Sequence, residues 1–187
     1  MNMRFSVIVL LIFLAAMSRL LPHPPNFAPV CAMALFGAAY FTQRYWAFII
    51  PIVSVWIGDL ILNNVVYGQC FDGFVWFYAD ALFIYGAFAL IVLLGMFTLK
   101  NVRIPTLFAS ALVASVIFFI VSNFGVWFLG SMYPKDLGGL MACYAAGLPF
   151  FHNTVLGDLF YTTALFGTFA LGVRSFPQLQ LQPVARQ

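Results

Sequence analysis

Residues 58–73 read Gly-Asp-Leu-Ile-Leu-Asn-Asn-Val-Val-Tyr-Gly-Gln-Cys-Phe-Asp-Gly, a polar stretch within a strongly apolar chain. The stretch predicts the end of a helix followed by a short loop, and its polar side chains are Asp59, Asn63, Asn64, Tyr67, Gln69, Cys70 and Asp72. Polar groups are tolerated at membrane depth only where protein or a water-filled cavity surrounds them. We therefore interpret this stretch as a candidate ligand site.

The composition around this stretch is that of a membrane protein. Of the 187 residues, 64% are hydrophobic and 7% are charged, whereas soluble domains carry about 25% charged residues. The apolar runs are longer and more continuous than the alternating segments of about ten residues found in membrane β-barrels. We predict an all-α integral membrane protein with one domain, residues 1–187. The net charge of +3 is spread over the loops and indicates no nucleic-acid partner.

The apolar runs and the residues that interrupt them predict six transmembrane helices. Their approximate ranges are 5–21, 29–42, 46–62, 74–99, 105–129 and 149–173. The first helix ends at Pro22-His23-Pro24-Pro25, because proline cannot continue a helix. Its apolar run is close in length to the core of a signal peptide, but the topology requires it as a retained helix.

The basic residues predict the orientation of this bundle. With six spans, one side of the membrane holds Arg4, Arg44, Lys100, Arg103, Arg174 and Arg186, and the other side holds Arg19 and Lys135. Loops on the cytoplasmic side carry the excess of lysine and arginine. Both termini are therefore expected in the cytoplasm, and the loops 22–29, 63–73 and 130–142 are expected outside.

A short repeated motif, Gly-Asp-Leu, places two carboxylates within apolar segments. Gly58-Asp59-Leu60 closes the third predicted helix, and Gly157-Asp158-Leu159 lies in the sixth. Ionisable groups inside membrane segments usually face the interior of the bundle. We expect both aspartates to do so.

Cys70 is a candidate metal ligand in the third loop. A thiolate is a soft ligand that suits transition metals. Asp72 opposes thiolate formation unless a cation compensates for its charge. Two alternatives stay open: an inert small residue, or a disulfide with Cys31 or Cys143, which would leave one of the three cysteines unpaired.

The two histidines are weaker candidates. His23 lies in a stiff proline-rich loop, where the alternative is an ordinary interfacial histidine, and His152 precedes Asn153 near the start of the sixth predicted helix, where the alternative is a buried hydrogen-bonded side chain. The His, Cys and Asp residues lack the spacing of a zinc site. The chain contains no Gly-x-Ser-x-Gly motif and no phosphate-binding loop.

Several motifs together resemble one family of small bacterial membrane proteins. They are the run Leu21-Pro-His-Pro-Pro-Asn-Phe-Ala-Pro29, Ala34-Leu-Phe-Gly-Ala38, Gly58-Asp-Leu, Asn123-Phe-Gly-Val-Trp127, Tyr133-Pro134, Cys143-Tyr144, Pro149-Phe-Phe-His-Asn-Thr154 and Gly157-Asp158. That family, once labelled only as of unknown function, is similar to the substrate-binding S-components of energy-coupling factor (ECF) vitamin transporters. Cys70 resembles the cobalt-ligating cysteine of the solitary cobalamin S-components, the BtuM-like group.

The resemblance implies a six-helix bundle in the bacterial inner membrane, with a pocket bounded by the first, third and fifth loops. The implied activity is uptake of cobalamin (vitamin B12) or a related corrinoid, with Cys70 as an axial cobalt ligand and, in a limited overlap with chemistry, expulsion of cyanide from cyanocobalamin. The implied pocket rim is His23, Asn26, Phe27, Tyr67, Asp72, Tyr133 and Tyr144. The amides that would bond the corrinoid are Asn63, Asn64 and Asn153.

The first helix departs from the family pattern. Many S-components dock on a coupling subunit through Ala-x-x-x-Ala, a spacing of small residues that allows close helix contact. Here Ala15 is followed four residues later by Arg19, and Ala16 by Leu20. Docking on an ECF module is therefore in doubt, which leaves the vitamin and the lipid bilayer as the expected partners.

Three alternatives to cobalamin uptake stay open. The same fold could bind another small vitamin or metabolite, with Cys70 incidental. A membrane enzyme could use Cys70 or His152 as nucleophile or base, although such a nucleophile needs an activating partner. A structural or assembly protein would explain the helices but not three polar loops on one side.

Overall fold

The computed structural model describes residues 2–70, 73–78 and 80–180 of the chain. The described residues form six α-helices joined by loops and short helical turns, as the sequence predicts. The helices are α1 (Met3–Met17), α2 (Val30–Tyr40), α3 (Arg44–Ile61), α4 (Ala81–Thr98), α5 (Ile104–Leu129) and α6 (Leu137–Ser175). Four shorter turns complete the described elements: η1 (Ser18–Leu20), η2 (Leu62–Val66), η3 (Gly68–Cys70) and η4 (Pro177–Leu179).

Five of the helices are long and apolar enough to cross a membrane, so the chain is a multi-pass membrane protein. The candidate spans are Met3–Leu20, Arg44–Val66, Ala81–Thr98, Ile104–Leu129 and Leu137–Ser175. The second helix, α2, has 11 residues. At 1.5 Å per residue its length is about 16 Å, about half of the roughly 30 Å hydrocarbon core of a bilayer. Five of the six predicted transmembrane helices therefore have the length of a span, whereas α2 is too short to cross that core alone.

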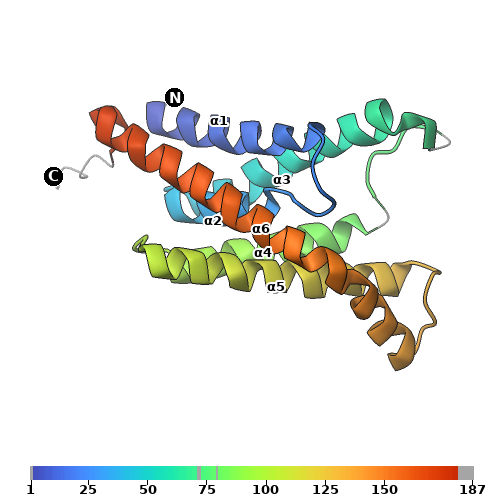
Figure 1. The fold of residues 1–187 in the computed structure, drawn as a ribbon. Helices are drawn as coiled ribbons and strands as arrows, with labels where there is room; N and C mark the ends of the chain where they lie inside the picture. Colours follow the sequence, from blue (N-terminus) through green and yellow to red (C-terminus); the bar gives the residue numbers. More distant parts are fainter. Residues whose placement is uncertain (1, 71–72, 79, 181–187) are drawn as a thin grey trace.

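The short helix α2 lies at the centre of the bundle and contacts each of the five long helices. In Figure 1 it lies between the pair α1 and α3 and the pair α4 and α5, while α6 runs diagonally past it. Its residues from Val30 to Gly37 are all buried. Small residues permit this central position: a Cβ on Gly95 of α4 would lie 2.7 Å from the Cβ of Ala38.

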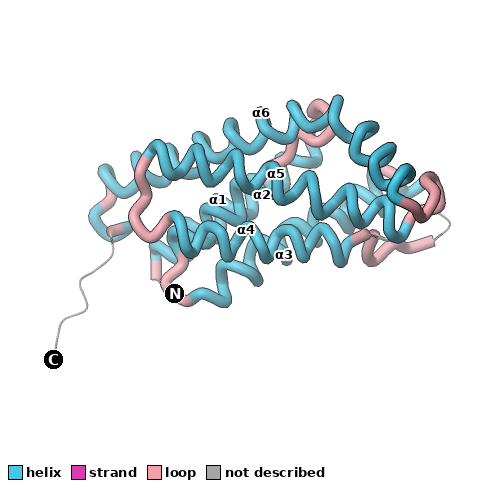
Figure 2. The backbone as a smooth tube through the Cα atoms, turned by 90° about the horizontal axis from the view of Figure 1, so that it is seen from below, coloured by secondary structure: helices cyan, strands magenta, loops and turns pink. Residues whose placement is uncertain are grey.

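The loops that follow α3 and α5 lie at one end of the bundle, which we call the loop end, and the loop that follows α1 turns back from that direction toward the middle of the bundle (Figure 1). The described residues of these loops are 67–70, 73–78 and 80, 130–136, and 21–29, respectively. The start of α1, the turns 41–43 and 99–103, and the end of α6 lie at the opposite end. Figure 2, turned by 90°, shows the same lengthwise helices with loops gathered at the two ends.

Two helix starts differ from the sequence prediction. The fourth helix begins at Ala81 rather than near residue 74, because Val75 pairs with the side chain of Asn64 instead of entering a helix. The sixth begins at Leu137 rather than near residue 149, and Asp136 caps it by accepting a hydrogen bond from the Gly139 amide at 2.7 Å. An N-cap aspartate satisfies a free helix amide, which offsets the low helix propensity of Gly138 and Gly139.

Candidate functional site

A cavity of about 150 Å³, largely apolar but with charged side chains in its wall, lies inside the bundle, toward the loop end. Its lining comes from the turn η1, from the helices α2 to α6 and from two loops. The lining residues are Arg19, Asn26, Ala28, Val30, Cys31, Val55, Asp59, Tyr78, Ile84, Phe118, Thr154 and Asp158. Three of these side chains are ionised in their ordinary state. Such groups are rare in membrane segments and mark functional sites by default.

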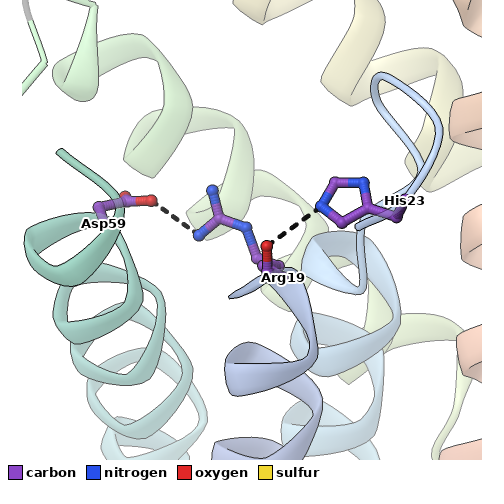
Figure 3. Close-up of polar contacts among 3 residues, drawn as sticks. All are labelled: Arg19, His23 and Asp59. Atoms are coloured by element: carbon purple, nitrogen blue, oxygen red, sulfur yellow. Dashed lines mark hydrogen bonds and ion pairs between the residues drawn. The ribbon is translucent and has the colours of Figure 1, made fainter. Parts of the chain in front are cut away.

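The first charged element of the cavity is an ion pair between α1 and α3. The Arg19 guanidinium, on the turn that ends α1, lies 2.7 Å from a carboxylate oxygen of Asp59, on the last turn of α3. Figure 3 shows the two side chains pointing toward one another across the gap between these helices. The pair is largely withdrawn from solvent, with side-chain exposures of 17% and 8%. Neither charge would be stable at this depth without the other.

The second charged element is Asp158, near the middle of α6. Its side chain is 1% exposed, and its Oδ2 accepts a hydrogen bond from the Ser115 hydroxyl of α5 at 2.6 Å. Cys31, in the first turn of α2, lines the cavity beside it. Because α2 begins at mid-bundle, its unpaired first-turn amides add positive partial charge near this carboxylate.

The two carboxylates of the repeated Gly-Asp-Leu motif therefore face the same cavity. Asp59 and Asp158 are both buried and both line it. The expectation that they face the bundle interior is confirmed.

Tyr78 contributes a phenol to the cavity from the loop before α4. Burial raises the pKa of this phenol, and the neighbouring Asp59 carboxylate raises it further. The hydroxyl therefore stays protonated at neutral pH and can donate a hydrogen bond to a ligand.

The first loop, residues 21–29, covers the cavity and is seated on α6. Asn26 adopts the left-handed conformation with φ of 63°, and the amide of Asn153 on α6 donates to the Pro25 carbonyl at 3.0 Å. The Phe27 ring lies 5.7 Å from the rings of Phe160 and Tyr161. Of the residues predicted as a pocket rim, Asn26 lines the cavity itself, whereas Phe27 holds the loop that covers it. Asn153, predicted as an amide that bonds the ligand, holds the same loop.

His23 ties the same loop to the end of α1. Its Nε2 lies 3.3 Å from the Arg19 carbonyl, and its Nδ1 lies 2.9 Å from the Pro24 carbonyl. Figure 3 shows the imidazole beside the backbone of Arg19, on the side away from Asp59. The structure therefore places His23 next to the ion pair but not in the cavity.

The third loop is held by Asn64, whose polar atoms are satisfied within the chain. Its Nδ2 donates to the carbonyls of Leu60 and Val75, both at 2.9 Å, and its Oδ1 accepts from the Val75 amide at 2.7 Å. Asn63 is 1% exposed, and its amide has no hydrogen-bond partner within the described part of the chain. Both lie in the π-helical turn η2, a feature common at functional sites, rather than in the loop as predicted.

The residues predicted on the rest of this loop lie outside the cavity or outside the described residues. Tyr67 is exposed. Asp72 and the side chain of Cys70 lie outside the described residues, so their predicted roles stay predictions. Cys31 and Cys143 are free thiols.

The fifth loop, residues 130–136, packs on itself and on α5. The indole of Trp127 donates to the Pro134 carbonyl at 2.8 Å, and Lys135 donates to the carbonyls of Trp127 and Gly130. The Tyr144 hydroxyl donates to the Ile120 carbonyl at 2.9 Å. The structure does not bring Tyr133 or Tyr144 to the cavity, and His152 is exposed on α6.

Sequence reasoning missed Arg19, Ser115 and Tyr78 as site residues. Arg19 was counted only as a loop charge, although a lone arginine at the end of an apolar helix requires a partner, and an aspartate at the end of another apolar helix is the natural one. Nothing in the sequence marks Ser115 among the small residues of α5. Tyr78 is one of several aromatic residues before α4 and has no distinguishing neighbour.

Comparison with known proteins gives one match. A model of a protein family whose function is unknown matches residues 1–179. No curated protein and no solved structure matches the chain.

Proposed function

The chain belongs to the family of unknown function DUF6580, and we propose that it takes up a small polar solute, a vitamin or a related metabolite, across the membrane. The solute binds in the cavity of Arg19, Asp59 and Asp158. The observation that carries this proposal is a cavity lined by one arginine and two aspartate side chains inside a largely apolar bundle. Packing alone does not require such groups, because replacing buried ion pairs by apolar residues is often neutral or stabilising.

The size of the cavity favours a small ligand. A cavity of about 150 Å³ in an engineered protein holds one benzene molecule, and the cavity here has about the same volume. A solute with about six non-hydrogen atoms therefore fits without rearrangement. The resemblance to S-components supports the proposal, because their pocket is bounded by the first, third and fifth loops, and the cavity here is lined from the first and third of these loops.

The proposal includes an orientation. The loop end faces outward and both termini face the cytoplasm, in the cytoplasmic membrane of a bacterium. The supporting observation is the excess of basic residues at the opposite end, where five of the described residues are basic, against two at the loop end. A solute would then enter the cavity from outside the cell, past the first loop.

A cavity-filling substitution tests the binding site. Val55 lines the cavity and is 2% exposed, so Val55→Phe places a ring where the solute would lie. We expect protein purified from cells to retain a small polar solute, identified by mass spectrometry after denaturation, and Val55→Phe to retain at least tenfold less. Uptake of that solute into cells should fall in parallel.

The matched control is Val53→Phe, on the same helix but 42% exposed. It adds the same ring outside the cavity and should retain the solute as the wild type does. If no solute distinguishes the wild type from Val55→Phe, the cavity is not a binding site and the proposal fails.

The second candidate function is corrinoid uptake, with cobalamin bound on the loop end rather than within the cavity. The observation that favours it is a group of exposed aromatic side chains on and beside the third loop: Tyr67, Phe74, Trp76 and Phe77. A corrinoid is far larger than the cavity but offers a broad apolar face to such a surface. Cys70 would then fill an axial position of the cobalt, and no ECF coupling module is assumed.

The substitution Cys70→Ser tests this second candidate. A hydroxyl is a harder and much less acidic ligand than a thiol, so it coordinates corrinoid cobalt poorly. We expect weaker binding of cyanocobalamin, by about a factor of ten for each 1.4 kcal/mol lost, and a changed absorption spectrum of the bound cobalt. Cys143→Ser is the control and should leave both unchanged. Unchanged affinity and spectrum in Cys70→Ser would remove Cys70 as the ligand.

A further inference from the structure

We infer that the solute bound in the cavity is a small organic cation, with a positively charged nitrogen held by Asp158. This inference rests on the proposed function and specifies its substrate class. It starts from the charged groups that line the cavity. Arg19 and Asp59 carry opposite charges, and Asp158 adds a second carboxyl group, which becomes negative when it ionises.

The positive charge of Arg19 is already paired with the Asp59 carboxylate. Arg19 lies 2.7 Å from Asp59, and theirs is the only ion pair among the residues that the structure describes. Asp158 accepts a hydrogen bond from the neutral Ser115 hydroxyl. The Asp158 side chain is 1% exposed, and no cation lies beside it within the described ranges. An ionised carboxylate there would be uncompensated, so the unliganded site favours the protonated acid, whereas a bound cation would favour the carboxylate.

Anionic, neutral and cationic ligands would differ in which charges of the cavity they leave unpaired. An anion would have to draw Arg19 from Asp59, which would leave the Asp59 carboxylate without its counter-charge. A neutral ligand would leave Asp158 protonated. A cation completes a second ion pair and leaves no charge uncompensated, which is the arrangement that buried charges require.

The other lining groups suit the same class of ligand. Phe118 and Tyr78 contribute aromatic rings to the cavity wall, and aromatic faces attract ammonium groups, most strongly where water is excluded. Asn26 and Thr154 line the cavity as well and offer hydrogen-bond acceptors for N–H groups. With about 150 Å³ of space, the cation is restricted to about the size of choline or ethanolamine.

A competition between charge classes tests the inference. Purified full-length protein is dialysed against an equimolar mixture of choline, ethanolamine, glycerol, acetate and propionate, and the retained solutes are measured by mass spectrometry. We expect the wild type to retain choline or ethanolamine in preference to the neutral and anionic probes. Asp158→Asn, which keeps the size of the side chain and removes its charge, should retain at least tenfold less.

Asp80→Asn is the matched control, because Asp80 carries the same charge at the start of α4 and does not line the cavity. It should retain the cations as the wild type does. Preference of the wild type for an anionic or neutral probe overturns the inference without any variant, and so does equal retention of cations by folded Asp158→Asn.

The result for Val55→Phe separates this inference from the proposed function. If the wild type retains none of the probes, the natural solute from that experiment replaces them. A natural solute with a cationic nitrogen supports the inference, and one without it contradicts the inference while the binding site stands. If that experiment finds no solute either, the proposed function itself has failed.

Discussion

Arg19→Met is expected to lower the free energy of unfolding by about 3–5 kcal/mol, because it leaves the buried Asp59 carboxylate without its partner. Methionine keeps much of the length of the arginine side chain, so the loss is one of charge more than of packing. The guanidinium and carboxylate lie 2.7 Å apart and are largely buried. The measurement is the thermal unfolding midpoint of the purified protein in detergent.

The double variant Arg19→Met/Asp59→Asn distinguishes the cost of an unpaired Asp59 charge from the other effects of replacing Arg19. It removes both charges, so it should recover most of the stability that the single variant loses. Arg174→Met, at an exposed position near the end of α6, is the control and should change the midpoint little. A single variant as stable as the double variant would show that Asp59 does not depend on Arg19.

Gly157→Val is expected to destabilise the protein by roughly 1–3 kcal/mol, the usual effect of overpacking, and to lift the first loop from α6. A Cβ at Gly157 would lie 3.0 Å from the Ala28 nitrogen and 3.1 Å from the Phe27 Cα. These are backbone atoms, so the contact cannot be relieved by turning a side chain. The cavity beneath the loop should open to solvent as a result.

Cys31 provides a native probe of that opening, because it lines the cavity and is 1% exposed. With Cys70 and Cys143 replaced by serine, maleimide labelling of Cys31 should be slow in the parent protein and several times faster in Gly157→Val. The control is Gly167→Val on the same helix, where an added Cβ meets nothing within 4 Å. Equal labelling rates in the two valine variants would show that Gly157 does not seat the loop.

The six helices were predictable because long apolar runs and prolines are strong local signals. The starts of α4 and α6 were not. Residues 74–78 read as apolar as any helix, and only the distant side chain of Asn64 draws Val75 out of helical geometry. At Asp136 a local signal did exist, since an aspartate N-cap outweighs two glycines in the first turn.

The candidate site was only partly predictable for a related reason. The sequence places Asp59 and Asp158 within apolar helices, which is enough to expect them in the interior. It does not show that the first loop folds back to bring Asn26 beside them, because Gly157, Asn153 and Phe27 make that contact across more than a hundred residues of chain. The role of Arg19 could not be predicted, because it lies at the boundary of a helix and a loop, and an arginine in a loop is ordinarily a solvated charge.

The half length of α2 changes how an electric field acts on this protein. If water entered the cavity from the loop end, it would carry the potential of that side to the first turn of α2. The voltage across the membrane would then fall mainly over a thickness of about 16 Å, in place of the roughly 30 Å of a bare bilayer. The local field would be about twice that in the surrounding lipid.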